Sequence, residues 1–384
     1  MRKIGVASLL LILSFNFYSI VLGEQNKSIH TQGTISYPNS NLIHGISMPT
    51  GSKFGYADYS HPVYSDVDYQ RIIDWGLNAV AFVVFWTNEA RLGGIEPYED
   101  QPGVYNEIVL EELDYQIELA QSYGLQVFIC SRVSLRQDGS VGWADIYGAD
   151  YVNLNKQDSS GSYGRERYIK LLKMLAQRDP DVGRDPWLVP YHNEVARAIE
   201  PDIVSTFYTV TQPALYNAIR SVSSAPIVLN GIIQGVAKND QGWYTGTGQL
   251  NNQPIYSDPN IFYGINTHDG APDYLYGHII KGSDWNYDYA SLEEYYRPAV
   301  EFKERNPETK LITMENLALD IHNLASERPI KQSRLDWMRA SLEIQEEIGI
   351  NWFYWRYEVT PEVQAPYEPD GTYTAVAELL KEYG

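Results

Sequence analysis

Two glutamates stand at the ends of apolar stretches of the chain. Glu194 ends the stretch Trp187–Glu194, and Glu315 directly follows Leu311–Met314. An ionised carboxylate in apolar surroundings must be compensated, so its place at the end of a buried strand indicates a functional site. Two facing carboxylates suit glycoside hydrolysis, in which one protonates the leaving oxygen and the other attacks the anomeric carbon. A retaining mechanism would require the two carboxyl groups to lie ~5–5.5 Å apart.

Other polar and aromatic residues also end apolar stretches. Those that stand beside or after predicted strand ends are Asn193, His268, Trp86, Trp352 and Trp355. Flat aromatic rings can pack on the apolar faces of sugars, and small-molecule sites combine such surfaces with a few polar groups. These residue types therefore agree with a carbohydrate site around the two glutamates.

Eight apolar stretches alternate with amphipathic segments between residues 42 and 384. The stretches are Leu42–Met48, Ala79–Trp86, Leu125–Ser131, Trp187–Glu194, Pro226–Gly231, Ile261–His268, Leu311–Leu317 and Ile350–Tyr357. Between them, apolar residues recur at helical spacing, for example at Tyr168, Leu171 and Leu175. This alternation predicts a (β/α)8 barrel. A doubly wound open sheet is the alternative, but no G-x-G-x-x-G motif follows any of the stretches.

The connections between these elements differ in length according to their direction. Those from helix to strand are short, such as Tyr123-Gly124, whereas those from strand to helix are long, such as Thr87–Asn106 and Arg132–Gly164. In a barrel the long connections gather at the C-terminal ends of the strands, where this fold places its active sites. They also hold many of the 31 Tyr and 9 Trp residues of the chain. The aromatic residues therefore concentrate where Glu194 and Glu315 are expected.

The composition excludes several other classes of protein. The formal net charge of −20 would repel phosphate, which makes nucleic-acid binding a poor interpretation. The 44% of hydrophobic residues suffices for a packed core, so the chain is not intrinsically disordered. A single cysteine, Cys130, excludes both an internal disulfide and a cysteine-rich zinc site.

The N-terminus predicts export from the cytoplasm. Met1-Arg2-Lys3 precedes an apolar run that ends near Gly23, the pattern of a secretory signal peptide. An uncleaved membrane anchor that leaves the main body facing outside is the alternative. We therefore divide the chain into a signal peptide at residues 1–23, a polar linker at 24–40 and one catalytic barrel at 41–384.

The ordered strand motifs resemble those of the clan A glycoside hydrolases, most closely the cellulase-like family 5. Gly45-Ile46-Ser47-Met48 looks like its first strand, and Ile72–Val80 looks like its junction between the first helix and the second strand. The most specific match is Leu175–Arg178 followed by Trp187–Glu194. The resemblance covers roughly residues 42–384 and implies a retaining glycosidase on a (β/α)8 barrel.

The resemblance also assigns roles to residues of this chain. It implies that Asn193 binds the sugar 2-hydroxyl, that Glu194 is the acid/base and that Glu315 is the nucleophile. His268 resembles the histidine on the sixth strand beside the site. A tryptophan of the eighth strand would form the floor of the sugar subsite. We favour Trp355 slightly over Trp352 for this role.

Three positions depart from the family pattern. Ala81 lies where the second strand normally carries an arginine, Cys130-Ser131-Arg132 lacks a common histidine, and Gly270 replaces a tyrosine. Arg132 could replace the missing cation from the neighbouring strand. The departures keep open a second interpretation, a carbohydrate-binding pseudoenzyme on the same barrel.

We therefore expect a secreted β-glycoside hydrolase that acts on a β-linked polysaccharide or oligosaccharide of cellulose, β-glucan or mannan type. The expected partner is this substrate, with no nucleic acid and no obligate protein partner. The mechanism needs neither a metal ion nor an organic cofactor. A metal-dependent barrel hydrolase is a third alternative, but His44-Gly45-Ile46 lacks the His-x-His pair that its first strand would normally carry.

Overall fold

The structure of the protein is a computed structural model. It describes residues 42–49, 64–85, 99–101, 104–135, 164–190, 207–230, 250–265, 289–316, 332–355, 357, 366 and 371–384. The predicted signal peptide, residues 1–23, and the predicted linker, residues 24–40, lie outside the described residues. All the elements below belong to the unit formed by residues 37–384.

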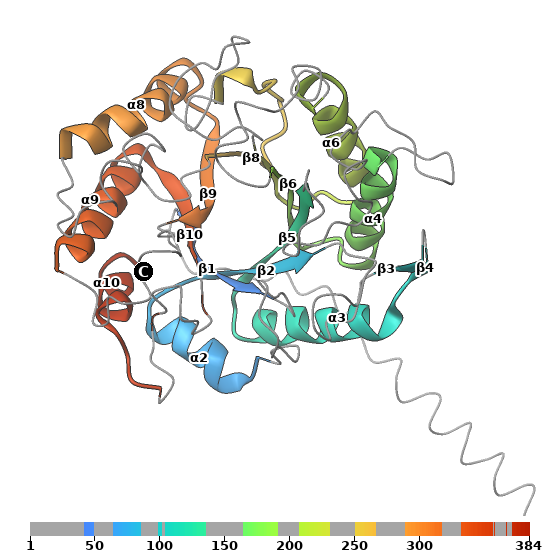
Figure 1. The fold of residues 1–384 in the computed structure, drawn as a ribbon, viewed down its shortest axis with the longest axis horizontal. Coiled ribbons are helices and arrows are strands. Elements are labelled where there is room, and N and C mark those ends of the chain that lie inside the picture. The colour runs from blue at the N-terminus through green and yellow to red at the C-terminus, as the bar shows by residue number, and fades with distance from the viewer. Residues whose placement is uncertain are drawn as a thin grey trace, which may run out of the picture. The chain divides into compact units, whose positions relative to one another are not determined.

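Eight parallel strands close into a barrel, with the spatial order β1-β10-β9-β8-β7-β6-β5-β2 (Figure 1). The strands are β1 (His44–Pro49), β2 (Ala79–Phe85), β5 (Gln126–Leu135), β6 (Gly183–Pro190), β7 (Ile227–Leu229), β8 (Ile261–Gly264), β9 (Lys310–Asn316) and β10 (Ile350–Tyr354). Each strand overlaps one predicted stretch, so the predicted (β/α)8 barrel is confirmed.

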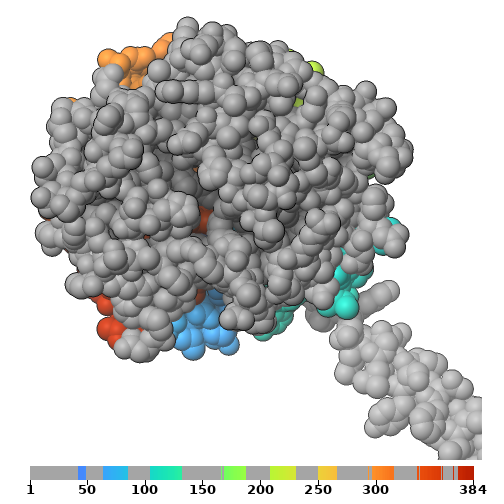
Figure 2. Space-filling view, viewed as in Figure 1, coloured from blue at the N-terminus to red at the C-terminus, as the bar shows by residue number. Residues whose placement is uncertain are grey.

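Helices surround the barrel, as Figure 1 shows. They are α2 (Asp66–Asp74), α3 (Glu107–Ser122), α4 (Gly164–Arg178), α6 (Gln212–Arg220), α8 (Tyr289–Arg305), α9 (Gln332–Ile348) and α10 (Ala375–Tyr383). A π-helical turn, η3 (Phe207–Thr211), precedes α6, and the strands β3 (Glu99–Gln101) and β4 (Val104–Tyr105) form a small antiparallel pair. Figure 2 shows atoms of α2, α3 and α8 at the rim of the same view. In the described residues, no helix combines the length and the apolar character that crossing a bilayer requires.

The side chains of the barrel strands alternate between two hydrophobic clusters. The inner cluster fills the barrel and consists of Ala79, Ala81, Phe128, Val228, Phe262, Ile312, Met314 and Phe353. The outer cluster lies between the barrel and the helices and takes the intervening residues, such as Val80, Leu311 and Trp352. Because successive residues of a strand point to opposite faces, the cluster of a residue identifies its face.

The helix α2 is capped at its start, and the joint that connects its end to β2 is short. Ser65 precedes α2 and donates its backbone N–H to Asp68 Oδ2 at 2.8 Å, as part of a capping box at the start of this helix. The chain then turns into β2 at Gly76, whose φ of 79° favours glycine. Such tight joints fix where each strand begins, and hence the level that its C-terminal end reaches.

Candidate active site

The structure tests the predicted site residues unequally. Glu194, Asn193, His268 and Trp86 all lie outside the described residues. What the structure describes is the strand that leads to each of them. In particular, β6 ends at Pro190, four residues before the predicted acid/base.

Glu315 is the penultimate residue of β9, which places its backbone at the C-terminal edge of the barrel. This edge is the one where barrels of this type hold their catalytic groups. Arg132 belongs to β5, where its backbone pairs in register with Phe85 on one side and Trp187 on the other. Glu315 therefore lies on the strand predicted for it, whereas Arg132, expected where the connection after the third strand begins, lies within β5.

A β-bulge lies immediately before the end of β9. Between Trp352 and Tyr354 the strand β10 advances by two residues, while its partner β9 advances from Thr313 to Asn316. An extra residue of this kind reverses the inward and outward alternation of the positions that follow it. Without it, position 315 would share the outward phase of Leu311.

With the bulge, Asn316 stands opposite Tyr354, a member of the outer cluster. The backbone position of Glu315 therefore comes into phase with Phe353, a member of the inner cluster. β-Bulges are common beside active sites because they re-aim a side chain. The bulge gives residue 315 the register that a nucleophile on the inner side of the barrel needs.

Ser47 of β1 holds the segments that flank this position. Its hydroxyl donates to the carbonyl oxygen of Met314 at 3.1 Å, and its own carbonyl oxygen accepts the N–H of Tyr357 at 2.9 Å. Ser47 is 1% exposed. One buried residue thus bonds to the neighbour of Glu315 and to the segment that follows Trp355.

The two tryptophans of the eighth barrel strand occupy different environments. Trp355 directly follows β10, two residues after the inner-cluster Phe353, and it is 3% exposed. Trp352 belongs to the outer cluster and is fully buried. Its ring stacks on His44 with a centroid distance of 4.8 Å, and its Nε1–H donates to Glu346 Oε1 at 3.1 Å.

The expectation that Trp352 could contact substrate is therefore corrected. Alternation along β10 turns Trp352 toward α9, because it is one residue out of phase with Phe353. Trp352 also pairs in register with His44, the first residue of β1, so it lies near the N-terminal end of the barrel strands, away from the catalytic edge. Of the two candidates, Trp355 is the one near the catalytic edge.

A polar pair that sequence reasoning missed lies inside the barrel. Asn230 Nδ2 donates to Asp185 Oδ1, and both side chains are buried. The main chain of Asn230 is held in turn by Gln212, whose Nε2 donates to its carbonyl oxygen at 3.1 Å. Gly264 on β8 leaves room for the pair, since a Cβ there would overlap Asn230 Oδ1. The charged Asp185 inside the run Gly183–Pro190 was the available signal.

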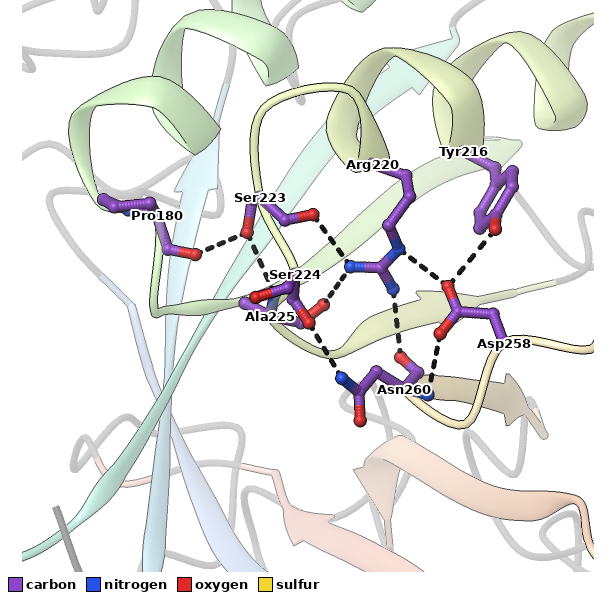
Figure 3. Close-up of polar contacts among 8 residues, drawn as sticks. All are labelled: Pro180, Tyr216, Arg220, Ser223, Ser224, Ala225, Asp258 and Asn260. Atoms are coloured by element: carbon purple, nitrogen blue, oxygen red, sulfur yellow. Dashed lines mark hydrogen bonds and ion pairs between the residues drawn. The ribbon is translucent and has the colours of Figure 1, made fainter. Parts of the chain in front are cut away.

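The starts of β7 and β8 are joined through Arg220 at the C-terminus of α6 (Figure 3). Its Nε donates to Asp258 Oδ2 at 2.7 Å, and its Nη1 donates to the carbonyl oxygens of Ser223 at 2.9 Å and Ala225 at 2.8 Å. Asp258 Oδ1 also accepts the N–H of Asn260 at 2.9 Å. This cluster is structural, and it sets the position of the strand that leads to His268.

The part of the chain that the structure describes contains no group of three or more His, Cys, Asp or Glu side chains that could hold a metal ion.

No protein-family model and no curated protein matches the chain. Among solved structures, XacCel5A in complex with cellopentaose has a TM-score of 0.59 and 12% identity, over 89% of this chain and 99% of that one. Endo-glycoceramidase II from Rhodococcus sp., solved as a lactosyl-enzyme intermediate, has a TM-score of 0.59 and 17% identity, over 88% of this chain and 78% of that one. Thermotoga maritima Cel5A in complex with mannotriose has a TM-score of 0.55 and 16% identity, over 89% and 97%.

At these identities the likeness concerns the fold. It extends over nearly the whole barrel, and the closed parallel order of the strands agrees with it. The chain has the (β/α)8-barrel fold of these solved structures.

Proposed function

We propose that the protein is a secreted, retaining β-glycoside hydrolase in which Glu315 is the nucleophile and Glu194 is the acid/base. The observation that carries the proposal is the register of β9. Its bulge brings the backbone position of Glu315 into the inner phase at the C-terminal edge of a barrel with a glycoside hydrolase fold. That edge supplies the catalytic groups in enzymes built on this fold.

The proposed reaction is a double displacement. The carboxylate of Glu315 attacks the anomeric carbon while the bond to the leaving oxygen breaks, and Glu194 gives its proton to that oxygen. Glu194 then takes a proton from water, and the water oxygen attacks the anomeric carbon. The ester to Glu315 breaks, which releases the sugar and restores both carboxyl groups to their starting states.

Labelling with a 2-fluoro glycoside tests the nucleophile. The fluorine slows release of the glycosyl-enzyme, so an active nucleophile becomes covalently modified. We expect one glycosyl mass on the intact protein and, after digestion, its location on the peptide that contains Glu315. Glu315→Gln should remove both the label and turnover.

Glu308→Gln is the matched control. Glu308 is an exposed glutamate in the turn before β9, at the opposite end of the strand from Glu315. This variant should keep the label and wild-type turnover. A label on another residue, or a turnover in Glu315→Gln that equals wild type, would show that the assignment is wrong.

The substrate class is proposed as a β-linked glucan or mannan. XacCel5A was solved with cellopentaose and Thermotoga maritima Cel5A with mannotriose, so the same fold accommodates both types of sugar. Release of reducing sugars from β-glucans, mannans and xylans would identify the class. A lactosyl glycolipid belongs in the same panel, because the Rhodococcus enzyme of this fold was solved with a lactosyl group.

The alternative function is a carbohydrate-binding pseudoenzyme, favoured by Ala81 at the position of the usual strand-two arginine. Ala81 lies in the inner cluster and is fully buried, so it supplies no charge to the site. The two functions differ in the labelling experiment. A pseudoenzyme would bind an oligosaccharide from the panel without acquiring a label and without turnover.

Secretion is a separate part of the proposal and rests on the apolar run that follows Arg2 and Lys3. The N-terminal sequence of the exported protein would test it. A mature N-terminus near Gly23 supports cleavage, whereas retention of Met1 in a membrane fraction would indicate an anchor.

A further inference from the structure

A cavity of about 520 Å³ lies at the end of the barrel opposite the candidate active site. Its walls come from residues at or just before the starts of strands, including Ile43 before β1, Gln126 of β5 and Lys310 of β9. The inner-cluster ring of Phe262 also lines it. We call this space the mouth cavity. Its volume falls within the range of about 300–1,000 Å³ that is usual for small-molecule sites.

The charged side chains that line the mouth cavity are cations, and the carboxylate of Glu308 acts on one of them, Lys303. Both charged lining residues of the cavity are lysines, Lys303 and Lys310, although the chain as a whole carries a net charge of −20. The Nζ of Lys310 lies 5.2 Å from the centroid of the Phe262 ring, and no ion pair of Lys310 occurs among the described residues. Lys310 therefore offers a cation that the described part of the protein does not neutralise.

Lys303 adds a second, more enclosed cation. Its Nζ donates to the carbonyl oxygens of Thr309 at 2.7 Å and Pro307 at 3.4 Å, which leaves one of its three N–H groups for another acceptor. Burial lowers the pKa of Lys303, because the charged form loses hydration. An anion in the cavity would restore part of this lost stabilisation.

Two neutral polar side chains of the lining, those of Asn351 and Asn260, are already bonded to the backbone. Asn351 accepts the N–H of Ile43 at 2.7 Å and donates to the carbonyl oxygen of Leu311 at 2.7 Å. Asn260 donates its side-chain N–H to the carbonyl oxygen of Ser224 at 2.9 Å. Recognition of a ligand would therefore depend mainly on the two lysines and on the apolar surfaces.

We propose that the mouth cavity binds a small organic monocarboxylate with an apolar or aromatic body. Its carboxylate pairs with Lys310, within reach of the remaining N–H of Lys303, and its body packs on Phe262 and Ile43. A single negative charge fits best, since Lys310 is the one lysine of the cavity that is not already bonded to backbone carbonyl oxygens. This site is independent of the proposed glycosidase activity.

Titration of the full chain with 4-phenylbutanoate, followed calorimetrically, tests this site. We expect saturable binding with one site per chain. The uncharged probe 4-phenylbutanamide should bind at least about tenfold more weakly, since it lacks the charge-assisted contact. Lys310→Met should weaken binding of the carboxylate by a similar factor, and added salt should weaken it further.

Lys381→Met is the matched control. Lys381 of α10 is another lysine over an aromatic ring, with Nζ 4.9 Å from the centroid of Tyr373, but it does not line the cavity. This variant should bind 4-phenylbutanoate like wild type, and both variants should keep wild-type glycosidase turnover. Absence of saturable binding, equal affinity for the amide, or an unchanged affinity in Lys310→Met would each overturn the proposal.

Discussion

The hydroxyl of Ser47 donates a hydrogen bond to the carbonyl oxygen of Met314 at 3.1 Å, from β1 to a strand that is not its neighbour in the barrel. The acceptor belongs to the bulged part of β9, one residue before Glu315. The backbone at this point is therefore fixed by β10 along the ladder and by β1 through a side chain. Ser47 therefore helps to fix the backbone next to Glu315, the residue that we propose as the nucleophile.

Replacement of Ser47 by alanine should affect both stability and turnover. Loss of the hydroxyl leaves a buried carbonyl oxygen without this donor, which should lower the free energy of unfolding by about 1–3 kcal/mol. The proposed nucleophile would then be held less firmly, so kcat should fall more than KM changes. Urea unfolding and steady-state kinetics, on a glycan that the substrate panel shows to be cleaved, measure the two effects.

Ser122→Ala is the control for this prediction. The hydroxyl of Ser122 also donates to a backbone carbonyl oxygen, that of Leu119 at 2.6 Å, but on the exposed surface of α3. It should leave kcat unchanged. If Ser47→Ala lost stability while kcat stayed at the wild-type value, Ser47 would be a structural residue without influence on Glu315.

Substitutions of the two tryptophans of the eighth barrel strand should change different properties. Replacement of Trp352 should lower stability, whereas replacement of Trp355 should lower activity. Trp352→Phe loses the hydrogen bond to Glu346 and part of the stacking on His44, so the free energy of unfolding should fall by about 1–3 kcal/mol. Its kcat/KM should stay near wild type. Trp355→Phe should instead lower kcat/KM, by about tenfold if the indole floors a sugar subsite. The opposite pattern in kinetics and urea unfolding would reverse the correction made for Trp352.

Asp179, which follows α4, should make stability depend on pH. Burial raises its pKa from 3.8 to about 6, and the charge of Asp114 adds to this effect while Arg184 and Arg178 oppose it. Among the described residues, the buried Oδ2 of Asp179 has no hydrogen-bond partner. Folding therefore favours the protonated carboxyl, and the stability it contributes below pH 3.8 is lost as pH rises through about 6.

Asp179→Asn removes this penalty. At pH 7 the variant should be more stable than wild type by roughly 1–3 kcal/mol, and the difference should shrink toward zero at pH 4. Urea unfolding at both pH values measures it. Asp181→Asn, at an exposed residue of the same turn, is the control substitution. A difference for Asp179→Asn that is equal at pH 4 and pH 7 would rule out the titration.

The order of strands and helices could be predicted from the sequence because each barrel strand is an apolar stretch covered on both faces. The exception is the start of β6, which lies at Gly183 and not at the predicted Trp187. Arg184 and Asp185 do not resemble strand residues. Arg184 is nevertheless fully buried, because its guanidinium donates to backbone carbonyl oxygens, including that of Leu175 at 2.8 Å. Such a compensation depends on the tertiary structure.

The site was predictable only to the level of strand ends. The run Lys310–Asn316 contains no glycine or other sign of a bulge, so its sequence does not reveal that the alternation changes before Glu315. The sequence favoured Trp355 over Trp352 only slightly, for a related reason. The two residues are three apart, so alternation alone places them on opposite faces. Which of the two faces the inside of the barrel depends on the register of β10.

Gly264 should be intolerant of even a methyl group. A Cβ at this position of β8 would overlap the amide oxygen of Asn230, whose nitrogen donates to the buried Asp185. Gly264→Ala should therefore lower the free energy of unfolding by about 1–3 kcal/mol through overpacking, or by more if the hydrogen bond to Asp185 breaks. Asn230→Ser in the same chain should relieve part of the overlap, so a double-mutant cycle should show coupling between the two positions.

The control for Gly264→Ala is Gly124→Ala, at a helix-to-strand joint where a Cβ would have no atom within 4 Å. Its φ of 78° makes alanine unfavourable there by about 1–2 kcal/mol, but for a reason that does not involve Asn230. Asn230→Ser should therefore leave the cost of Gly124→Ala unchanged. Additive free energies for both glycine variants would show that the inside of the barrel absorbs the methyl group elsewhere, and that Asp185 and Asn230 do not require a glycine at this position of β8.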